Sequence, residues 1–266
     1  EHVPFNFRAR ALAVLGGTFR AGGFLGPLLG AAVVSLFDVQ AAFAVSAVVC
    51  LLSALVLMVQ KDDSHSKPDP AAKTSLRHVT KRELPKLASI GTGAALLVFV
   101  RTSRQIGLPL WGIFLGMHPA QISLYIGIAG AVDFALFYTS GQIIDRFGRR
   151  WSIVPTMTAL GIGMIAMVLA TSPSLFLTLA VCLSIANALS SGIILTLGAD
   201  LAPKDGRNEF LAAFRMMCDA GGAASPLAVS ALTAAFSLPV AFVVVGIVSI
   251  GGAFGLWHYL PKFGIR

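Results

Sequence analysis

The chain has 266 residues, of which 56% are hydrophobic and only 12% are charged. A soluble domain carries about 25% charged residues, and a soluble fold of this size cannot hide so much apolar side chain without exposing large patches. The formal net charge of +8 does not indicate nucleic-acid binding, because the basic residues lie in the gaps between apolar runs. The composition therefore predicts a chain whose main solvent is lipid.

Eight apolar runs reach the length of about 20 residues that a membrane-crossing helix needs. In chain order they are residues 11–36, 39–60, 87–116, 120–143, 151–171, 174–198, 209–232 and 239–260. The third run is longer than a bilayer core requires, so we expect it to be tilted or to break near Gly107–Pro109. The pattern predicts an all-α membrane protein with eight transmembrane helices.

The Lys and Arg residues occupy alternate connections between these runs. Sixteen of the 20 lie before the first run, in residues 61–86, 146–150 and 199–208, or in the tail, whereas the connections near 38, 118, 173 and 237 contain none. Basic connections stay in the cytoplasm. We therefore predict a multi-pass protein of the plasma (inner) membrane with both ends of this chain cytoplasmic.

Residues 61–86 form the only long polar stretch, and we expect them to be a cytoplasmic linker between residues 1–60 and 87–266. Pro, Ser and Asp in the first half of the stretch predict a flexible chain. The second half is either a basic helix on the anionic inner leaflet or a solvated linker that sets topology.

Two of the runs share a sequence pattern. FRAGGFLGPLLGA (19–31) and CDAGGAASPLAVS (218–230) both contain Ala-Gly-Gly and Pro-Leu in the same register, with prolines 199 residues apart. Both copies enter the membrane from the same side. This arrangement predicts a parallel repeat about an axis along the membrane normal.

The sequence GQIIDRFGRR (141–150) resembles the G-x-x-x-D-R-x-G-R-R signature of the major facilitator superfamily. The matching positions are Gly141, Asp145, Arg146, Gly148, Arg149 and Arg150. The resemblance implies a twelve-helix fold with parallel pseudo-repeat halves, of which this chain corresponds to spans five to twelve. Residues 1–60 are then the last two helices of the N-terminal half, and residues 87–266 are the six-helix C-terminal half. We expect a fragment that lacks the N-terminal four helices, or one chain of a split transporter.

In that family the motif loop is a gate that latches the cytoplasmic side when the carrier faces outward. Gly148 allows a tight turn, and Asp145 can accept hydrogen bonds from a helix N-terminus. Arg149 and Arg150 can pair with carboxylates or lipid phosphate. Pseudo-symmetry predicts that the loop meets the start of the first run, near residues 8–11. The alternative is a basic loop that only sets topology.

The first run also resembles the antiporter motif of the family's exporters, G-(x)8-G-x-x-x-G-P-x-x-G-G. The matching positions are Gly22, Gly26, Pro27 and Gly30. Ala13 and Ala31 replace the first and last glycines of the motif, and both are small enough for close helix packing. The resemblance implies export rather than uptake, and the alternative is a generic packing helix.

Charged residues well inside the apolar runs are Arg20, Arg101, Arg104, Asp133, Arg215 and Asp219. Each costs about 2.5–3.5 kcal/mol at mid-membrane, so it should face a partner or a wet cavity. Arg20 and Asp133 lie at matching depths in helices that the family packs together, so we predict an ion pair, either switching or static. Arg215 either forms an intrahelical ion pair with Asp219, four residues further on, or Asp219 has its partner on a missing helix. A buried Asp133 or Asp219 can carry the proton that drives exchange.

Arg101 and Arg104 lie one turn apart in a helix that lines the central cavity in the family, and Asn187 comes from the other cavity-lining helix. The two arginines can bind an anionic substrate group bidentately. The alternative is that they pair with acids of the missing half.

Nothing in the sequence indicates an enzyme or a cofactor, because there is no phosphate-binding loop, metal-ligand spacing or nucleophile beside a base. Cys50, Cys182 and Cys218 lie inside apolar runs, and we expect them to be small core residues. We predict a proton-coupled secondary transporter that exports small organic molecules, anionic or amphipathic, by alternating access. The alternatives are an uptake symporter of the same fold and a transport-inactive membrane partner half.

Overall fold

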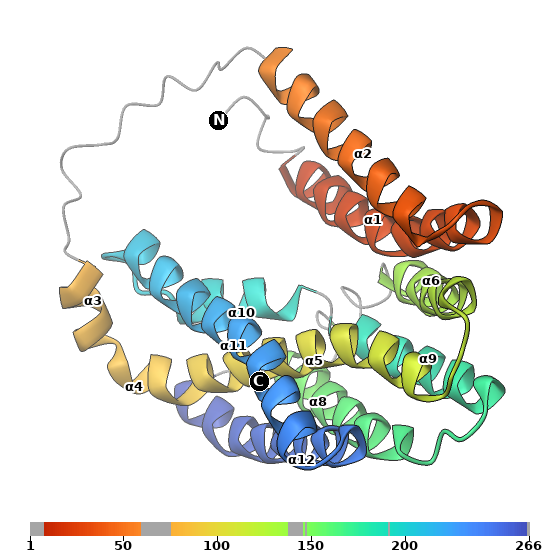
Figure 1. Cartoon of the computed structure of the whole chain (residues 1–266). Coiled ribbons are helices and arrows are strands. Elements are labelled where there is room, and N and C mark those ends of the chain that lie inside the picture. Colours follow the sequence, from red (N-terminus) through yellow and green to blue (C-terminus); the bar gives the residue numbers. More distant parts are fainter. Residues whose placement is uncertain (1–7, 60–75, 138–145, 147, 191, 265–266) are drawn as a thin grey trace.

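A computed structural model describes residues 8–59, 76–137, 146, 148–190 and 192–264, except for the side chains of 8–17, 19, 20 and 59. The regular structure of these residues is helical throughout, with no strand among them (Figure 1). The long helices are α1 (Arg8–Leu36), α2 (Val39–Val59), α5 (Thr92–Phe114), α6 (Pro119–Ala135), α8 (Arg149–Met167), α9 (Pro173–Ala188), α10 (Ile193–Leu201), α11 (Arg207–Ala235) and α12 (Leu238–Tyr259). Shorter pieces are α3 (Leu76–Arg82), α4 (Leu84–Lys86), a π-helix (Leu87–Gly91) and a final 3-10 turn (Leu260–Phe263).

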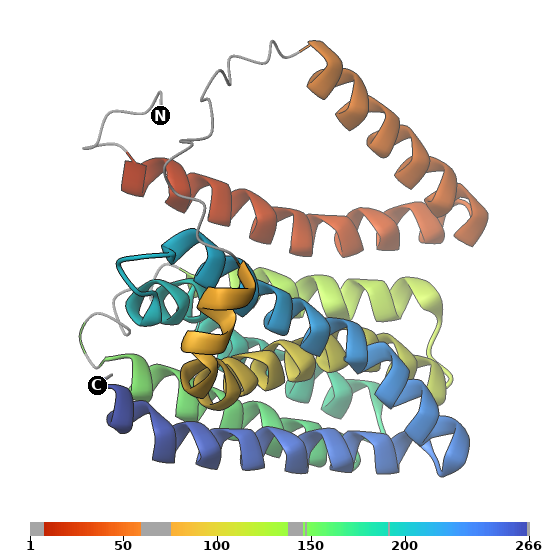
Figure 2. The ribbon, with the colours of Figure 1, turned by 90° about the vertical axis from the view of Figure 1, so that its left-hand side faces the viewer.

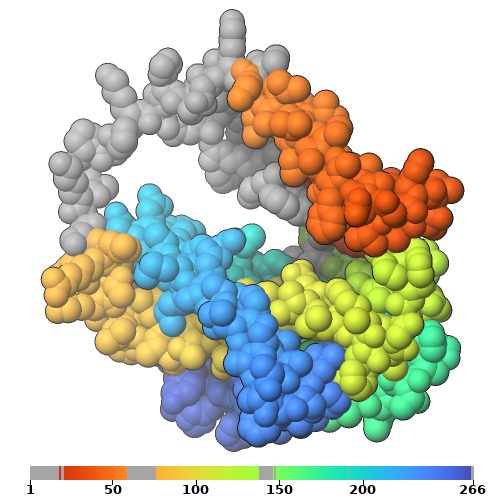
Figure 3. Space-filling model, viewed as in Figure 1, coloured from red at the N-terminus to blue at the C-terminus, as the bar shows by residue number. Residues whose placement is uncertain are grey.

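Helices α5, α6 and α8 to α12 form one bundle, and α1 lies against it along α6, while α2 joins α1 and points away from the bundle (Figures 2 and 3). Within the bundle α8 packs on α12, α5 on α11, and α6 on α9. We call the end where α5, α8 and α11 begin and α10 and α12 end the basic end, because Arg149, Lys204, Arg207 and Lys262 lie there.

Four helical segments among the described residues are long and apolar enough to cross a membrane. They are Val39–Met58, Leu84–Phe114, Pro173–Leu201 and Leu238–Phe263. Helix α2 exposes its apolar side chains on almost every face, including Leu57 and Met58, which are 69% and 81% exposed. A helix that is apolar all round is stable in lipid or against another helix but not in water. The exposed surface therefore supports the membrane environment that the composition predicts.

The predicted repeat is visible in the helices themselves. Helix α11 begins and ends 199 residues after α1, at 207 and 235 against 8 and 36, and both are 29 residues long. Pro27 and Pro226 lie inside the two helices at the same position. The two helices thus match in length as well as in sequence register.

Two of the predicted helices differ from expectation. Of the two alternatives for the third run, a tilt or a break near Gly107–Pro109, the break is wrong, because α5 continues through both residues. Gly107 lies so close to α12 that an added Cβ would be 2.8 Å from Cζ of Phe242. Proline is tolerated inside membrane helices where neighbouring helices pack closely against them. The run 174–198 is interrupted instead: α9 ends at Ala188, and α10 begins after Gly192, whose φ of +79° favours glycine.

The second half of the polar stretch is helical and packs on the protein. Helix α3 lies against α11 with Val79 fully buried, and Arg82 Nη2 donates a hydrogen bond of 2.8 Å to the Asp205 carbonyl oxygen. The Lys86 ammonium lies 2.7 Å from Glu83 Oε2, and its hydrogen bond lowers the pKa of Glu83. Residues 76–86 are therefore helical and anchored to the bundle, while the choice between a leaflet-bound helix and a solvated linker stays a prediction, and the first half lies outside the described residues.

The expectation that all three cysteines are core residues is correct for Cys218 only. Cys218 is buried, whereas Cys50 and Cys182 are exposed on α2 and α9. A small apolar side chain fits a lipid-facing position as well as a core one, so an apolar run does not distinguish the two.

The contact between α8 and α12 depends on two glycines. A Cβ added to Gly161 would lie 2.7 Å from the Gly246 carbonyl oxygen, a backbone atom that cannot rotate away. We expect Gly161→Ala to lower the free energy of unfolding by about 1–3 kcal/mol. Gly251→Ala is the matched control, because its Cβ would meet no atom within 4 Å. Thermal unfolding in detergent checks both, and equal melting temperatures for the two variants would contradict this packing.

Candidate functional site

A cavity of about 970 Å³ lies inside the molecule and is lined by residues of α1, α5, α6, α9 and α11. Its wall contains Pro27, Arg101, Arg104, Asp133, Asn187 and Arg215, so the structure brings six of the predicted site residues to one space. Pockets of about 300–1,000 Å³ with a few convergent polar groups are typical small-molecule sites. The cavity is therefore the candidate functional site.

Arg101 of α5 binds the interruption between α9 and α10. Its Nη2 donates to the Ser190 carbonyl oxygen at 3.0 Å and to Ser190 Oγ at 2.6 Å. Ser152 Oγ of α8 donates to the Leu189 carbonyl oxygen at 3.0 Å. A helix end leaves carbonyl groups without helical partners, and lipid cannot hydrogen-bond to them. Ser152 thus supplies a partner for the Leu189 carbonyl oxygen. Arg101 adds a second donor to the Ser190 carbonyl oxygen, which also accepts a bond of 3.3 Å from the Ile193 backbone N–H.

Two further polar contacts join α9 to its neighbours. Arg104 Nη1 donates to Ser184 Oγ at 2.9 Å, and Asn187 Nδ2 donates to Asp133 Oδ1 at 2.9 Å. Ser184, Asn187 and Ser190 are three residues apart, so they follow one face of the chain. We call these three residues and their partners Arg104, Asp133 and Arg101 the polar ladder. It ties α5 and α6 to α9 beside the cavity.

The predicted ion pair between Arg20 and Asp133 stays a prediction, because the Arg20 side chain lies outside the described residues. The packing behind it is present, since α1 lies along α6. A Cβ added to Gly127 would be 2.7 Å from the Leu28 side chain, and one on Gly130 would be 3.0 Å from Phe24 Cβ. The glycines of α6 thus allow the close approach of α1.

Arg215 and Asp219 form the intrahelical pair that was one of two alternatives. Arg215 Nε lies 3.0 Å and 3.2 Å from the two carboxylate oxygens of Asp219. Both side chains are more than half exposed, although Arg215 reaches the cavity wall. Of the two candidate proton carriers, Asp133 is therefore the one that lines the cavity.

The described part of the motif loop lies at the basic end. Gly148 has a φ of +88° and precedes α8, as the predicted tight turn requires. Arg149 Nε lies 2.8 Å from Asp200 Oδ2 of α10, and the Arg150 guanidinium lies 3.4 Å from the ring centre of Trp257 of α12.

These two arginines connect the ends of α8, α10 and α12. Arg146 lies between residues that the structure does not describe, and Gly141 and Asp145 are outside the described residues. The side chains of residues 8–11 are outside them too, so the predicted contact of the loop with these residues is untested. The gate itself stays a prediction.

The antiporter-like positions of α1 are open in this structure. A Cβ added to Gly22, Gly26 or Gly30 would meet no described atom within 4 Å, while Pro27 lines the cavity. The close contact of α1 is made instead at Phe24 and Leu28, against the glycines of α6. The packing role predicted for Gly22, Gly26 and Gly30 is untested.

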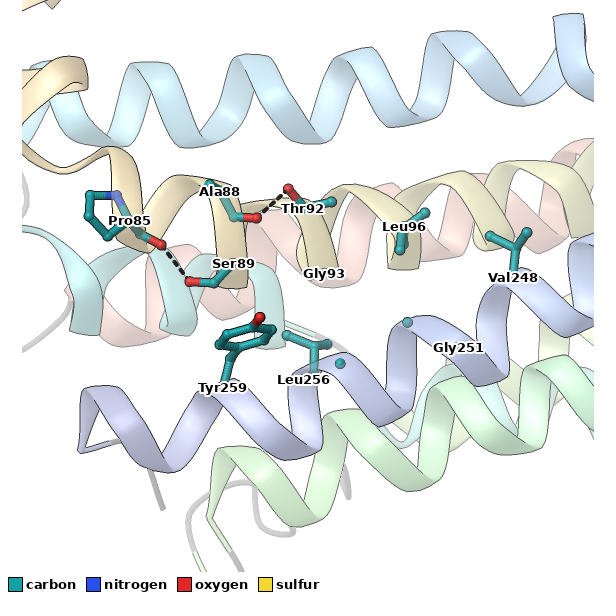
Figure 4. Close-up of a pocket in the computed structure, with 12 residues that line it drawn as sticks. Pro85, Ala88, Ser89, Thr92, Gly93, Leu96, Val248, Gly251, Leu256 and Tyr259 are labelled. Carbon is teal, nitrogen blue, oxygen red and sulfur yellow. Dashed lines mark hydrogen bonds between the residues drawn. The ribbon is translucent and has the colours of Figure 1, made fainter.

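A second groove of about 530 Å³ runs between the start of α5 and the end of α12 (Figure 4). Two of its hydroxyl groups bond to the backbone of the preceding turn, Ser89 to the Pro85 carbonyl oxygen at 2.6 Å and Thr92 to the Ala88 carbonyl oxygen at 2.8 Å, and Tyr259 also lines the groove. No charged side chain lines it among the described residues. The groove therefore lacks the convergent polar groups of the cavity.

Sequence reasoning missed Ser184 and Ser190, because lone serines in apolar helices commonly bond to their own backbone. Their spacing from Asn187, three residues on either side, was the available signal. This spacing indicates a polar contact only when the structure shows that α5 faces that side of α9.

Comparison with protein families gives an independent result. The model of the Major Facilitator Superfamily matches residues 1–132 and 92–264 of the chain. A search of curated proteins finds no match to the chain.

The bond between Arg104 and Ser184 can be measured with a double-mutant cycle. We expect the Arg104→Ala and Ser184→Ala variants to show a coupling of about 1.5–3 kcal/mol, because a buried hydrogen bond to a charged group is strong. The control cycle is Arg149→Ala with Asp200→Ala, whose side chains are 33% and 35% exposed and should couple by about 0–1 kcal/mol. Unfolding in detergent measures both. A coupling near zero for the buried pair would contradict a stabilising hydrogen bond between Arg104 and Ser184.

Proposed function

The chain belongs to the major facilitator superfamily, and we propose that it exports small organic molecules in exchange for protons. Members of this family are secondary transporters and not enzymes, so the chain is a multi-pass membrane protein of a transporter family. The observation that supports transport most directly is the cavity, which gathers three arginines and an aspartate inside a chain with only 12% charged residues. Charges at membrane depth mark substrate and proton pathways.

Asp133 is our candidate for the proton carrier. It lines the cavity and accepts a hydrogen bond from Asn187, which joins α6 to α9. Protonation removes the negative charge and weakens this charge-assisted bond. Proton binding would therefore weaken the bond between Asn187 and Asp133, and with it the contact between α6 and α9 in the cavity wall.

The contact between α1 and α6 is our candidate for the moving interface. Gly127 and Gly130 give α6 a smooth surface there, against Phe24 and Leu28 of α1. We propose that residues 1–60 rock against residues 87–266 along this contact, so that the cavity opens to each side in turn. The basic end then faces the cytoplasm, where Arg149 and Asp200 hold the gate.

Export is proposed from the antiporter-like sequence of α1, and it can be tested in energised membrane vesicles with ethidium and fluorescein as cationic and anionic probes. We expect inverted vesicles to accumulate a probe when their interior is acidified, and nigericin to abolish this. Asp133→Asn should reduce accumulation to background, because the variant cannot carry a proton. Asp205→Asn is the matched control, since Asp205 is exposed in a loop at the basic end.

The vesicle orientation separates the alternatives. Accumulation in right-side-out vesicles only would make the protein an uptake symporter. Absence of transport in both orientations, with the protein folded, would favour a transport-inactive partner half.

A further inference from the structure

The described wall of the cavity has an excess of positive charge near the polar ladder. Arg101 and Arg104 bind hydroxyl and carbonyl oxygens of α9 and its following turn, and both line the cavity. Asp133 is the acid of the ladder, while Arg215 is matched by Asp219. Each guanidinium carries five donors in a planar fork that fits a carboxylate. In a cavity with low-dielectric walls, this excess favours an anion over a cation.

Asn187 adds an acceptor next to these donors. It is only 8% exposed, and its Nδ2 is used by Asp133, which fixes the direction of the amide. Its Oδ1 is buried and has no hydrogen-bond partner among the described residues. A buried acceptor is costly to leave unpaired. Because Asn187 lines the cavity, a ligand that donates a hydrogen bond would satisfy it.

The rest of the wall near these groups is apolar. Leu108, Ile122 and Ile126 line the same cavity on α5 and α6. A substrate that fills this space therefore needs an apolar body in addition to its polar end.

We propose that the substrate is a small organic carboxylate that carries a hydroxyl or amino donor beside the carboxylate and has an apolar body. Its carboxylate lies at Arg101 and Arg104, and its donor group faces Asn187 Oδ1. This inference rests on the proposed function, because it names the substrate class of the same cavity. It excludes organic cations as preferred substrates, since they would meet two arginines.

Four probes with one aromatic body separate the two recognition elements. Mandelate has the carboxylate and the donor, phenylacetate has only the carboxylate, 1-phenyl-1,2-ethanediol has only donors, and 2-amino-1-phenylethanol is a cation with a donor. Binding to the purified protein is measured by thermal stabilisation and calorimetry, without a proton gradient. We expect mandelate to bind about three- to tenfold more tightly than phenylacetate, and the diol and the amine not to bind measurably.

Variants assign the recognition to the cavity. Arg104→Gln should weaken mandelate binding roughly tenfold to a hundredfold, and Arg104→Lys should keep the preference for anions because it keeps the charge. Arg82→Gln is the control, since it removes an exposed charge on α3 outside the cavity. The four probes on the unmodified protein still decide the question if Arg104→Gln does not fold.

Three results would overturn the proposal: binding of the amine as tight as that of mandelate, binding of none of the four probes, or unchanged mandelate binding in Arg104→Gln. The test also separates this inference from the proposed function. Mandelate binding without proton-driven transport would leave the substrate class intact and remove the coupling. Proton-driven efflux of ethidium without binding of any anion would support the coupling and contradict the substrate class.

Discussion

Lipid offers no hydrogen bonds, so a charge or an interrupted backbone within the membrane must find a partner in the protein or face a water-filled cavity. Arg101 is a charged side chain, and it binds the place where a helix is interrupted. Its guanidinium binds the Ser190 carbonyl and hydroxyl groups, which lie where α9 stops short of α10. The Ser190 carbonyl oxygen also accepts a bond from the Ile193 backbone N–H, so Arg101 reinforces the interruption, and the interruption gives the guanidinium two oxygen acceptors. The interruption and the arginine stabilise each other, and the geometry of the cavity wall follows from this dependence.

The same constraint joins structure to transport. The polar ladder fixes α5 and α6 to α9, and its members that face the cavity are the groups a substrate or a proton can reach. Helix α1 closes the cavity from the other side through a contact that glycines of α6 keep smooth. A rigid, hydrogen-bonded wall on one side and a smooth, apolar contact on the other are the physical basis for our proposal that residues 1–60 move against the bundle as a unit.

The sequence allowed much of this to be predicted, and the failures have physical causes. The length of the apolar runs located the helices, and the register of Ala-Gly-Gly and Pro-Leu predicted that α1 and α11 correspond. The cost of charge in lipid singled out Arg101, Arg104 and Asp133, and the family resemblance placed the two arginines in the central cavity, but only the structure shows that Asp133 lines the same cavity. The interruption between α9 and α10 was missed because Gly192 is one of many glycines in apolar runs. The break that was one alternative at Gly107–Pro109 is absent, since proline is tolerated in a membrane helix that packs closely on its neighbours. Ser184 and Ser190 needed tertiary structure, since only the position of α5 shows that they accept bonds from arginines. Arg149 and Asp200 are 51 residues apart, and no local pattern pairs them.

The central claim is that the charges of the polar ladder face water inside a lipid-embedded bundle. The most direct measurement compares two single cysteines in a background without Cys50, Cys182 and Cys218, using a negatively charged thiol reagent that does not cross membranes. One cysteine replaces Gln105, which lines the cavity, and the other replaces Ile247, which is 58% exposed on α12 away from it. The account predicts that the cysteine at 105 reacts and the one at 247 does not, because a thiol in lipid stays protonated and out of reach. Equal reaction at both positions, or reaction at 247 alone, would contradict it.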